Sequence, residues 1–257
     1  MTFVDQLDAA IKRNNSLLCV GLDVDLARLP QRFFNSDDPI FLFNQEIINA
    51  TRDLACAFKP NIAFYEMYGL YGISSLLKTI DYVHEAGLPV ILDAKRGDVG
   101  HSSAAYAKSI FQSYKADATT VNPYLGHDSV QPFLDYQEKG TFILCLTSNK
   151  GFRDFQTTGN GEPLYKSVAR HAKEWNHYGN CGLVVGATKP EELKEIKEIA
   201  GDMPLLIPGV GAQGGDLAHS VKYGGQRAVI NASRSIIYAA DPRAEAKKLR
   251  DEINKYR

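Results

Sequence analysis

Charged residues lie at the end of an apolar segment in the middle of the chain. The segment Leu88–Lys95 is apolar except for Asp93 and Lys95. These two lie two positions apart, so both side chains face the same side of an extended strand. Asp98 follows in the next turn. Charges at the end of a buried strand are costly unless they are paired or used. The pattern favours a site in which an ammonium stabilises developing charge and transfers a proton; a surface ion pair is the alternative.

Two other segments end in charged residues of the same kinds. Lys59 lies in Phe58-Lys-Pro-Asn61, and Asp23 ends Val20-Gly-Leu-Asp23. In a barrel of parallel strands, the active site lies at the carboxyl ends of the strands. Three consecutive strands would then bring Asp23, Lys59 and the pair Asp93/Lys95 to one rim.

Glycine-rich and basic segments follow the last two apolar runs. The first is Pro208-Gly-Val-Gly-Ala-Gln-Gly-Gly215 and the second is Asn231-Ala-Ser-Arg-Ser235. Glycines let backbone N–H groups approach an anion, and barrels commonly bind phosphate with the loops after strands seven and eight. Arg234 is the natural bidentate phosphate ligand. A glycine-rich turn without a ligand is the alternative.

Ser148 lies in the polar segment Leu146-Thr-Ser-Asn149, which follows the fifth apolar run. Its hydroxyl could bind the amide-like edge of a ring, and a capping or turn role fits equally well.

Eight short apolar runs recur along the chain and predict buried parallel strands. They are Leu17–Asp23, Ala57–Asn61, Leu88–Lys95, Ala118–Tyr124, Thr141–Ser148, Cys181–Thr188, Pro204–Gly211 and Arg227–Ser233. Segments with helical spacing separate them, among them Phe41–Leu54, Leu76–Ala86 and Pro190–Ala200. We therefore expect an α/β (β/α)₈ TIM barrel, with residues 1–257 as one domain. An open doubly wound sheet is the alternative. The polar segment Asn149–Glu162 is expected to form a long loop.

Composition excludes several classes of protein. Charged residues make up 23% of the 257 residues and the formal net charge is -1, which argues against nucleic acid as a bulk electrostatic partner. The chain has neither a membrane-length apolar run nor a signal-peptide pattern. The histidines lack metal-binding spacing. Four cysteines without a C-x-x-C motif indicate buried free thiols, and together these features predict a cytoplasmic protein.

The residues above, taken together, resemble the orotidine 5'-phosphate decarboxylase family, in particular its longer bacterial members (the type 2 subfamily). The motif Asp-x-Lys-x-x-Asp is present as Asp93-Ala-Lys95-Arg-Gly-Asp98 and continues as Val-Gly-His-Ser-Ser-Ala-Ala-Tyr. The segments ending strands one, two, five, seven and eight match in order. Asp-x-Lys-x-x-Asp alone is shared with related sugar-phosphate barrels, whereas its combination with Ala-Gln-Gly-Gly is more specific.

This resemblance implies an activity and a role for each site residue. The activity would be decarboxylation of orotidine 5'-monophosphate to UMP, the last step of UMP biosynthesis, without metal or organic cofactor. Lys59, Asp93, Lys95 and Asp98 would form an alternating charge array with Lys95 as proton donor. Asp98 and Ser102 would enter the site of the partner subunit in a homodimer. Contacts to the substrate would come from Asp23 and Lys59 at the ribose, Ser148 at the pyrimidine, and Gln213 and Arg234 at the phosphate.

Two other functions remain compatible with parts of this pattern. A metal-dependent keto-sugar-phosphate decarboxylase or aldolase would share Asp-x-Lys-x-x-Asp but use a divalent cation to stabilise an enediolate. A non-catalytic nucleotide-binding barrel would share the glycine-rich loops, but it would have no need of Lys95 and Asp98.

Overall fold

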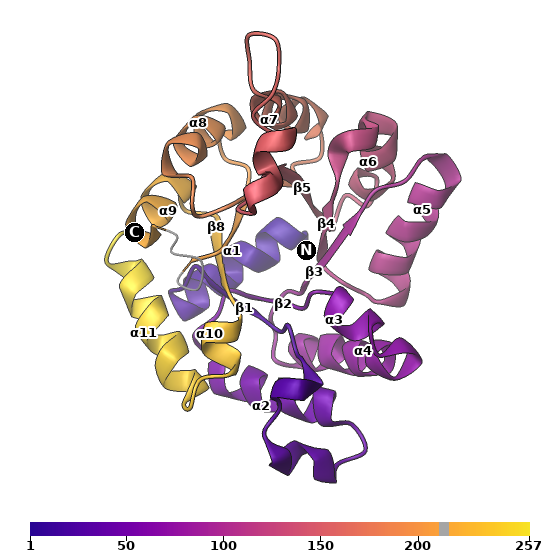
Figure 1. Cartoon of the computed structure of the whole chain (residues 1–257), viewed down its shortest axis with the longest axis vertical. Coiled ribbons are helices and arrows are strands. Elements are labelled where there is room, and N and C mark those ends of the chain that lie inside the picture. Colours follow the sequence, from indigo (N-terminus) through magenta and orange to yellow (C-terminus); the bar gives the residue numbers. More distant parts are fainter. Residues whose placement is uncertain (211–215) are drawn as a thin grey trace.

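The computed structural model describes residues 1–210 and 216–257 and contains eight parallel strands alternating with helices (Figure 1). Each strand coincides with one of the eight apolar runs, although β3 extends one residue past its run, to Arg96, and β5 begins one residue before its run, at Gly140. The strands are β1 (Leu18–Gly21), β2 (Ala57–Lys59), β3 (Ile91–Arg96), β4 (Ala118–Val121), β5 (Gly140–Leu146), β6 (Cys181–Val185), β7 (Leu205–Pro208) and β8 (Ala228–Ala232). Most are shorter than the runs, because the polar residues at the run ends leave the sheet and enter the loops.

The strands form one sheet in the order β2-β1-β8-β7-β6-β5-β4-β3, and every pair is parallel. Its two outer strands, β2 and β3, meet through two isolated parallel bridges, Phe58 with Val90 and Asn61 with Asp93. The Asp93 N–H donates to the Pro60 carbonyl at 2.9 Å, and the Ile62 N–H donates to the Asp93 carbonyl at 3.2 Å. These contacts nearly close the sheet into a barrel, which confirms the predicted TIM-barrel fold. We call this β2–β3 junction the seam.

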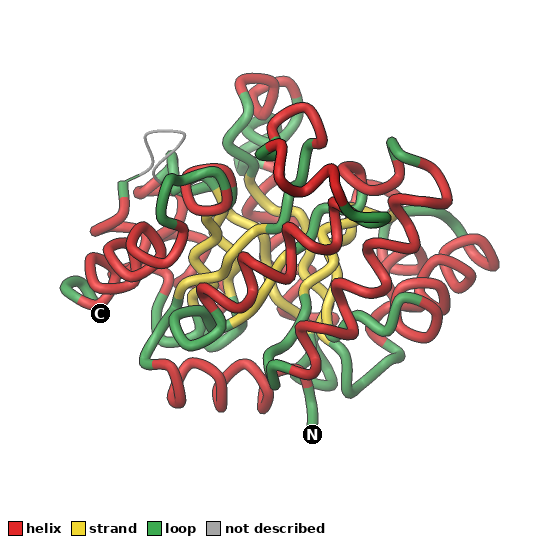
Figure 2. Tube along the Cα trace, turned by 90° about the horizontal axis from the view of Figure 1, so that it is seen from below, coloured by secondary structure: helices red, strands yellow, loops and turns green. Residues whose placement is uncertain are grey.

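Helices surround the strands on the outside of the barrel (Figure 2). The α-helices are α1 (Phe3–Asn14), α2 (Pro39–Thr51), α3 (Ala63–Glu66), α4 (Gly69–Glu85), α5 (Gly100–Lys108), α6 (His127–Leu134), α7 (Leu164–Trp175), α8 (Pro190–Ala200), α9 (Leu217–Gly224), α10 (Arg234–Ile237) and α11 (Pro242–Asn254). Shorter turns are η1 (Leu26–Arg28), η2 (Gln31–Asn35), the π-helical η3 (Ser109–Ser113), η4 (Pro123–Leu125) and η5 (Lys150–Asp154). The predicted helix at Pro190–Ala200 has the bounds of α8. The helix predicted at Phe41–Leu54 is shifted by two to three residues from α2, and the one predicted at Leu76–Ala86 covers only the C-terminal part of α4.

Helix α1 covers the end of the barrel where the strands begin (Figure 1). Its Phe3 packs edge-on against Phe142 of β5, with ring centroids 5.7 Å apart. Gly140, at the start of β5, leaves room for this ring, since a Cβ there would lie 2.4 Å from it. The opposite end, where the strands finish, is left to the loops that carry the predicted site residues.

The strand side chains form the core of the molecule. Residues of β1, β2, β4, β6 and β8 are buried along their whole length, as expected for strands covered on both faces. All four cysteines are buried free thiols. Burial raises the pKa of the Cys19 thiol to about 12. Among the described residues, no helix is long and apolar enough to span a bilayer.

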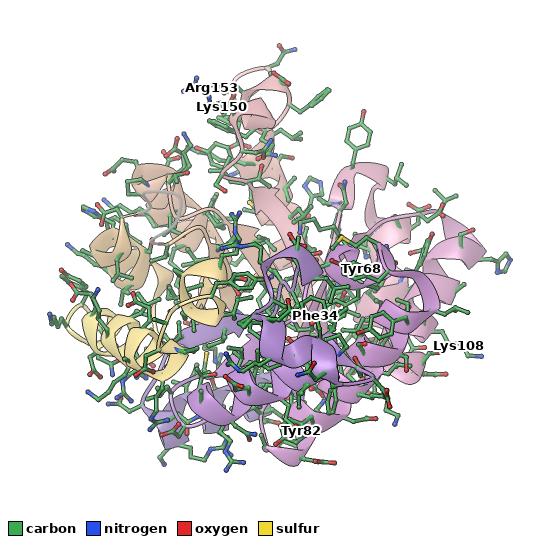
Figure 3. All side chains as sticks on the ribbon, turned by 60° about the horizontal axis from the view of Figure 1, so that its bottom comes forward. Phe34, Tyr68, Tyr82, Lys108, Lys150 and Arg153 are labelled. Atoms are coloured by element: carbon green, nitrogen blue, oxygen red, sulfur yellow. The ribbon has the colours of Figure 1, made fainter. Side chains whose placement is uncertain are left out.

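The segment after β5 was predicted to be a long loop and begins with the 3-10 turn η5. The rest of it projects beyond α7 (Figure 1). Gln156 holds it to the barrel: its side-chain oxygen accepts from the Thr147 N–H at 2.8 Å, and its amide donates to the Thr147 hydroxyl at 2.8 Å. Lys150 and Arg153, both in η5, lie at the edge of the molecule (Figure 3).

Candidate active site

Two adjacent strands bring three of the predicted charges into contact. Lys59 ends β2, and Asp93 and Lys95 lie in β3 across the seam. The Lys59 ammonium lies 3.0 Å from Asp93 Oδ2, and the Lys95 ammonium lies 2.5 Å from Asp93 Oδ1. Lys59 is almost fully buried, whereas 48% of the Lys95 side chain is exposed. One carboxylate therefore holds one ammonium inside the barrel and another at its mouth.

Mutual attraction keeps this array charged despite its burial. Burial alone would raise the pKa of Asp93, but the positive charges of Lys59 and Lys95 outweigh it and hold that pKa well below its usual range. Burial would likewise lower the pKa of Lys59, and the carboxylates of Asp93 and Asp23 raise it above its usual value. Asp93 is therefore a carboxylate and Lys59 an ammonium across the physiological pH range.

The array lies on one side of a cavity of about 240 Å³ at the mouth of the barrel. Leu144, Val184 and Leu206 line the cavity from β5, β6 and β7, and they are paired in one row of the sheet. The cavity therefore has a charged wall and an apolar wall, and the apolar wall strengthens electrostatic interactions inside it.

Ser148 lies on the rim of this cavity, after β5. Gly186, which follows β6, allows the close approach of this segment, because a Cβ there would lie 2.9 Å from the Ser148 backbone nitrogen. The structure thus places Ser148 within reach of anything bound next to Lys95.

Asp23 follows β1 on a tightly held segment. The preceding residue, Leu22, donates its N–H to the Lys59 carbonyl at 3.1 Å and accepts at its own carbonyl from the Tyr65 hydroxyl at 2.8 Å. Asp23 Oδ1 is buried and has no hydrogen-bond partner. Asp23 is not among the residues that line the cavity, and its negative charge acts on the neighbouring Lys59 ammonium.

Asp98 and Ser102 are not among the residues that line the cavity. Asp98 lies beyond β3, where its Oδ1 accepts from the Val99 N–H at 2.8 Å, and Ser102 is exposed in α5. Within one chain the structure therefore brings Lys59, Asp93 and Lys95 together and leaves Asp98 and Ser102 outside the cavity.

Arg234 is exposed at the first position of α10, directly after β8. At the end of the neighbouring strand β7, Pro208 lines the cavity. The predicted phosphate ligand Arg234 thus lies at the mouth, beside strand seven. Gln213 lies outside the described residues.

Comparisons with known proteins settle which family has this arrangement. The model of the orotidine 5'-phosphate decarboxylase / HUMPS family matches residues 16–249. The chain belongs to this family. It is 50% identical to the orotidine 5'-phosphate decarboxylase of Ralstonia nicotianae over 272 positions, covering all of both chains. The solved structure of Leishmania donovani OMP decarboxylase has a TM-score of 0.90 and 42% identity, covering 100% of this chain and 99% of that one. The solved structure of Leishmania donovani UMP synthase has a TM-score of 0.91 and 44% sequence identity, and the match covers 100% of this chain and 56% of that one.

This membership confirms the resemblance found in the sequence, but several site residues were not found there. The apolar wall was missed because Leu144, Val184 and Leu206 are typical core residues of strands. Thr120 of β4, which also lines the cavity, was missed because threonine is common in any strand. The only sequence signal was its place in a strand next to β3. Among the described residues, no group of three or more His, Cys, Asp or Glu side chains could hold a metal ion.

Proposed function

We propose that this protein catalyses the decarboxylation of orotidine 5'-monophosphate to UMP and CO₂, the last step of UMP biosynthesis, without a metal or an organic cofactor. The observation that carries the proposal is the Lys59–Asp93–Lys95 array beside a cavity with an apolar wall, in a chain that belongs to the orotidine 5'-phosphate decarboxylase / HUMPS family.

The central step is the loss of CO₂ from C6 of the pyrimidine. The bond between C6 and the carboxylate carbon breaks, and its electron pair remains on C6. The Lys95 ammonium stabilises this charge and then donates a proton to C6. Lys95 suits this role because its ammonium lies at the mouth of the cavity, 2.5 Å from Asp93.

Asp93 holds Lys95 in place and would lie beside the departing carboxylate. Its negative charge would repel that carboxylate in the ground state. The apolar wall of Leu144, Val184 and Leu206 accepts the neutral CO₂ and keeps water from the carbanion.

The remaining site residues bind parts of the substrate away from C6. Asp23 and Lys59 bind ribose hydroxyls. Ser148 binds the pyrimidine edge, and Arg234 and Gln213 bind the phosphate. Binding energy from the phosphate can drive loop closure and assemble the site around C6.

Asp98 and Ser102 act in the site of the partner subunit, and the protein is a homodimer. Both residues lie outside the cavity of their own chain. Large apolar side chains are exposed close to them in the sequence and in the next loop: Val99, Tyr106, Tyr124 and Leu125 are between 40% and 77% exposed. Exposed large apolar side chains are suited to burial in a protein–protein interface. We also assign the protein to the cytoplasm, a proposal supported by its four free thiols.

An assay with orotidine 5'-monophosphate in excess EDTA tests the activity. We expect stoichiometric UMP and CO₂ at the same rate with and without the chelator, because the ammonium of Lys95 supplies the charge that a metal would otherwise supply. Activity lost in EDTA and restored by Mg²⁺ would favour the keto-sugar-phosphate enzyme. UMP binding without turnover of the substrate would favour the non-catalytic barrel.

A further inference from the structure

Thr120 lies at the centre of β4, faces the array, and is 1% exposed. Its hydroxyl donates to Asp93 Oδ1 at 3.0 Å and accepts from the Lys95 backbone N–H at 2.9 Å. A hydroxyl has one proton to donate, so the first bond uses it and the second uses a lone pair. Thr120 therefore connects the carboxylate of one array residue to the backbone of another.

The pairing of β3 with β4 is irregular at this point. Leu92 pairs with Thr119 and Arg96 pairs with Val121, so Asp93, Ala94 and Lys95 all lie opposite Thr120. A regular parallel ladder would place one residue there. At this bulge the Lys95 N–H donates to the side-chain hydroxyl of Thr120.

Lys95 also has an unusual backbone conformation. Its φ is +47°, in the left-handed region, which residues other than glycine rarely adopt. Such a conformation is strained for a residue with a side chain, and it persists only where the surroundings of the residue fix it. The hydrogen bond that the Lys95 N–H donates to the Thr120 hydroxyl is one such constraint. It acts on the residue whose ammonium must reach C6.

We propose that Thr120 is a positioning residue of the decarboxylation: its hydroxyl holds the Lys95 backbone in the bulged, left-handed conformation and at the same time orients the Asp93 carboxylate that binds the Lys95 ammonium. The inference rests on the proposed function. Lys95 is thus fixed at both ends, because Asp93 Oδ1 accepts from its ammonium and from the hydroxyl that holds its backbone.

The neighbouring Thr119 provides a matched control. It is also fully buried in β4, and its hydroxyl donates to the Leu92 carbonyl at 2.8 Å on the other side of the strand. Replacing either threonine by valine removes one buried hydroxyl and keeps the shape of the side chain. Only the change at position 120 removes a bond to the array.

The experiment compares Thr120→Val, Thr120→Ser and Thr119→Val, with kcat and KM for orotidine 5'-monophosphate and Kd for UMP from calorimetry. Thr120→Val should lower kcat by about tenfold or more, since a displacement of ~1 Å in a reacting group can cost ~10²-fold. Its UMP affinity should stay within about threefold, because the ribose and phosphate contacts are unchanged. Thr120→Ser should restore most of the kcat, and Thr119→Val should keep it. If valine disturbs the sheet, Thr120→Ala provides the same comparison.

Three results would overturn the inference: a normal kcat in Thr120→Val, an equal loss in Thr120→Ser, or an equal loss in Thr119→Val. A crystal structure of Thr120→Val adds a readout independent of turnover, and we expect Lys95 to leave the left-handed region there. Unchanged backbone geometry at Lys95 would count against the proposal. Failure of the proposed function itself would appear separately, as a wild-type protein that does not convert the substrate.

Discussion

Asp93 is the residue on which the other side chains of the array depend. Its Oδ2 accepts from Lys59, and its Oδ1 accepts from Lys95 and Thr120. Lys59 is buried, so its charge depends on Asp93 and Asp23, whereas Lys95 is half exposed and reaches water. Removing Asp93 would leave an ammonium in the barrel with one carboxylate fewer, and removing Lys95 would leave Asp93 still paired.

This asymmetry predicts different costs for two substitutions. Asp93→Asn should lower the free energy of unfolding at pH 7 by about 3 kcal/mol, as expected when one partner of a buried ion pair is removed. Lys95→Met should lower it by less than about 1 kcal/mol, as for a solvent-accessible pair. Urea denaturation of both variants measures the difference. Equal losses would mean that the Lys59–Asp93 pair contributes no more than the exposed one.

The cost of Asp93→Asn should also depend on pH. The pKa of Asp93 is depressed in the folded protein, so its contribution to stability is complete above the unfolded-state pKa of about 3.9 and is lost as the pH falls through the folded-state pKa. The wild-type and variant unfolding free energies should therefore differ most at neutral pH and converge below pH ~4. A constant difference down to acid denaturation would contradict the depressed pKa.

The charged residues could be predicted from the sequence because charge at the end of an apolar run is rare and conspicuous. Thr120 could not, because its role depends on a bulge that forms only when β3 pairs with β4. The left-handed conformation of Lys95 has the same origin, since nothing in Asp-Ala-Lys-Arg-Gly-Asp marks position 95 for a positive φ.

At the scale of elements, the strands were the most predictable part of the fold. Continuous apolar runs identify parallel strands buried on both faces, and all eight were located in this way. The predicted ends lie beyond the observed ends for every strand except β3, because the polar residues that follow each strand belong to the loops; at β2, Asn61 retains only an isolated bridge to Asp93. The η5 turn was missed because a 3-10 turn is too short to show a periodic pattern.

The short helix α10 carries the prediction for the phosphate. Arg234→Ala should lose about 2–5 kcal/mol of transition-state binding, because the bound phosphate would lose the charged partner that it pairs with in the complex. Steady-state kcat/KM with the full substrate measures this loss. With a substrate that lacks the phosphate, added phosphite dianion should activate the wild type and leave the variant unchanged. Equal activation of both proteins would place the phosphate elsewhere.

At the scale of the whole molecule, one chain supplies only part of the proposed site. Lys59, Asp93 and Lys95 meet within the chain, whereas Asp98 and Ser102 lie outside its cavity and beside the exposed side chains of Val99 and Tyr106. The sequence could place Asp98 next to Lys95 in the chain, but only the family resemblance could assign it to a partner.

Mixed dimers test this arrangement directly. Lys95→Ala and Asp98→Ala should each be nearly inactive. After subunit exchange, the mixed dimers should have one site lacking both residues and one site lacking neither. Up to about a quarter of wild-type activity should return, because random exchange makes roughly half the dimers mixed, with one of two sites intact. Native mass spectrometry establishes that exchange took place. Mixed dimers without activity would show that Asp98 serves its own chain.

The seam has a consequence for how the barrel moves. The other adjacent strands pair as ladders, with irregularities between β3 and β4 and between β5 and β6, whereas β2 and β3 meet only through two isolated bridges among the described residues. The Lys59–Asp93 ion pair crosses this junction, so the side chains that would hold the substrate also fasten the barrel where it is most easily opened. Separation of β2 from β3 would then also break the Lys59–Asp93 ion pair of the array. A bound nucleotide that contacts both strands would stabilise the seam. Hydrogen exchange of the Ile62 and Asp93 amides, which donate across the seam, would then be slower in the complex.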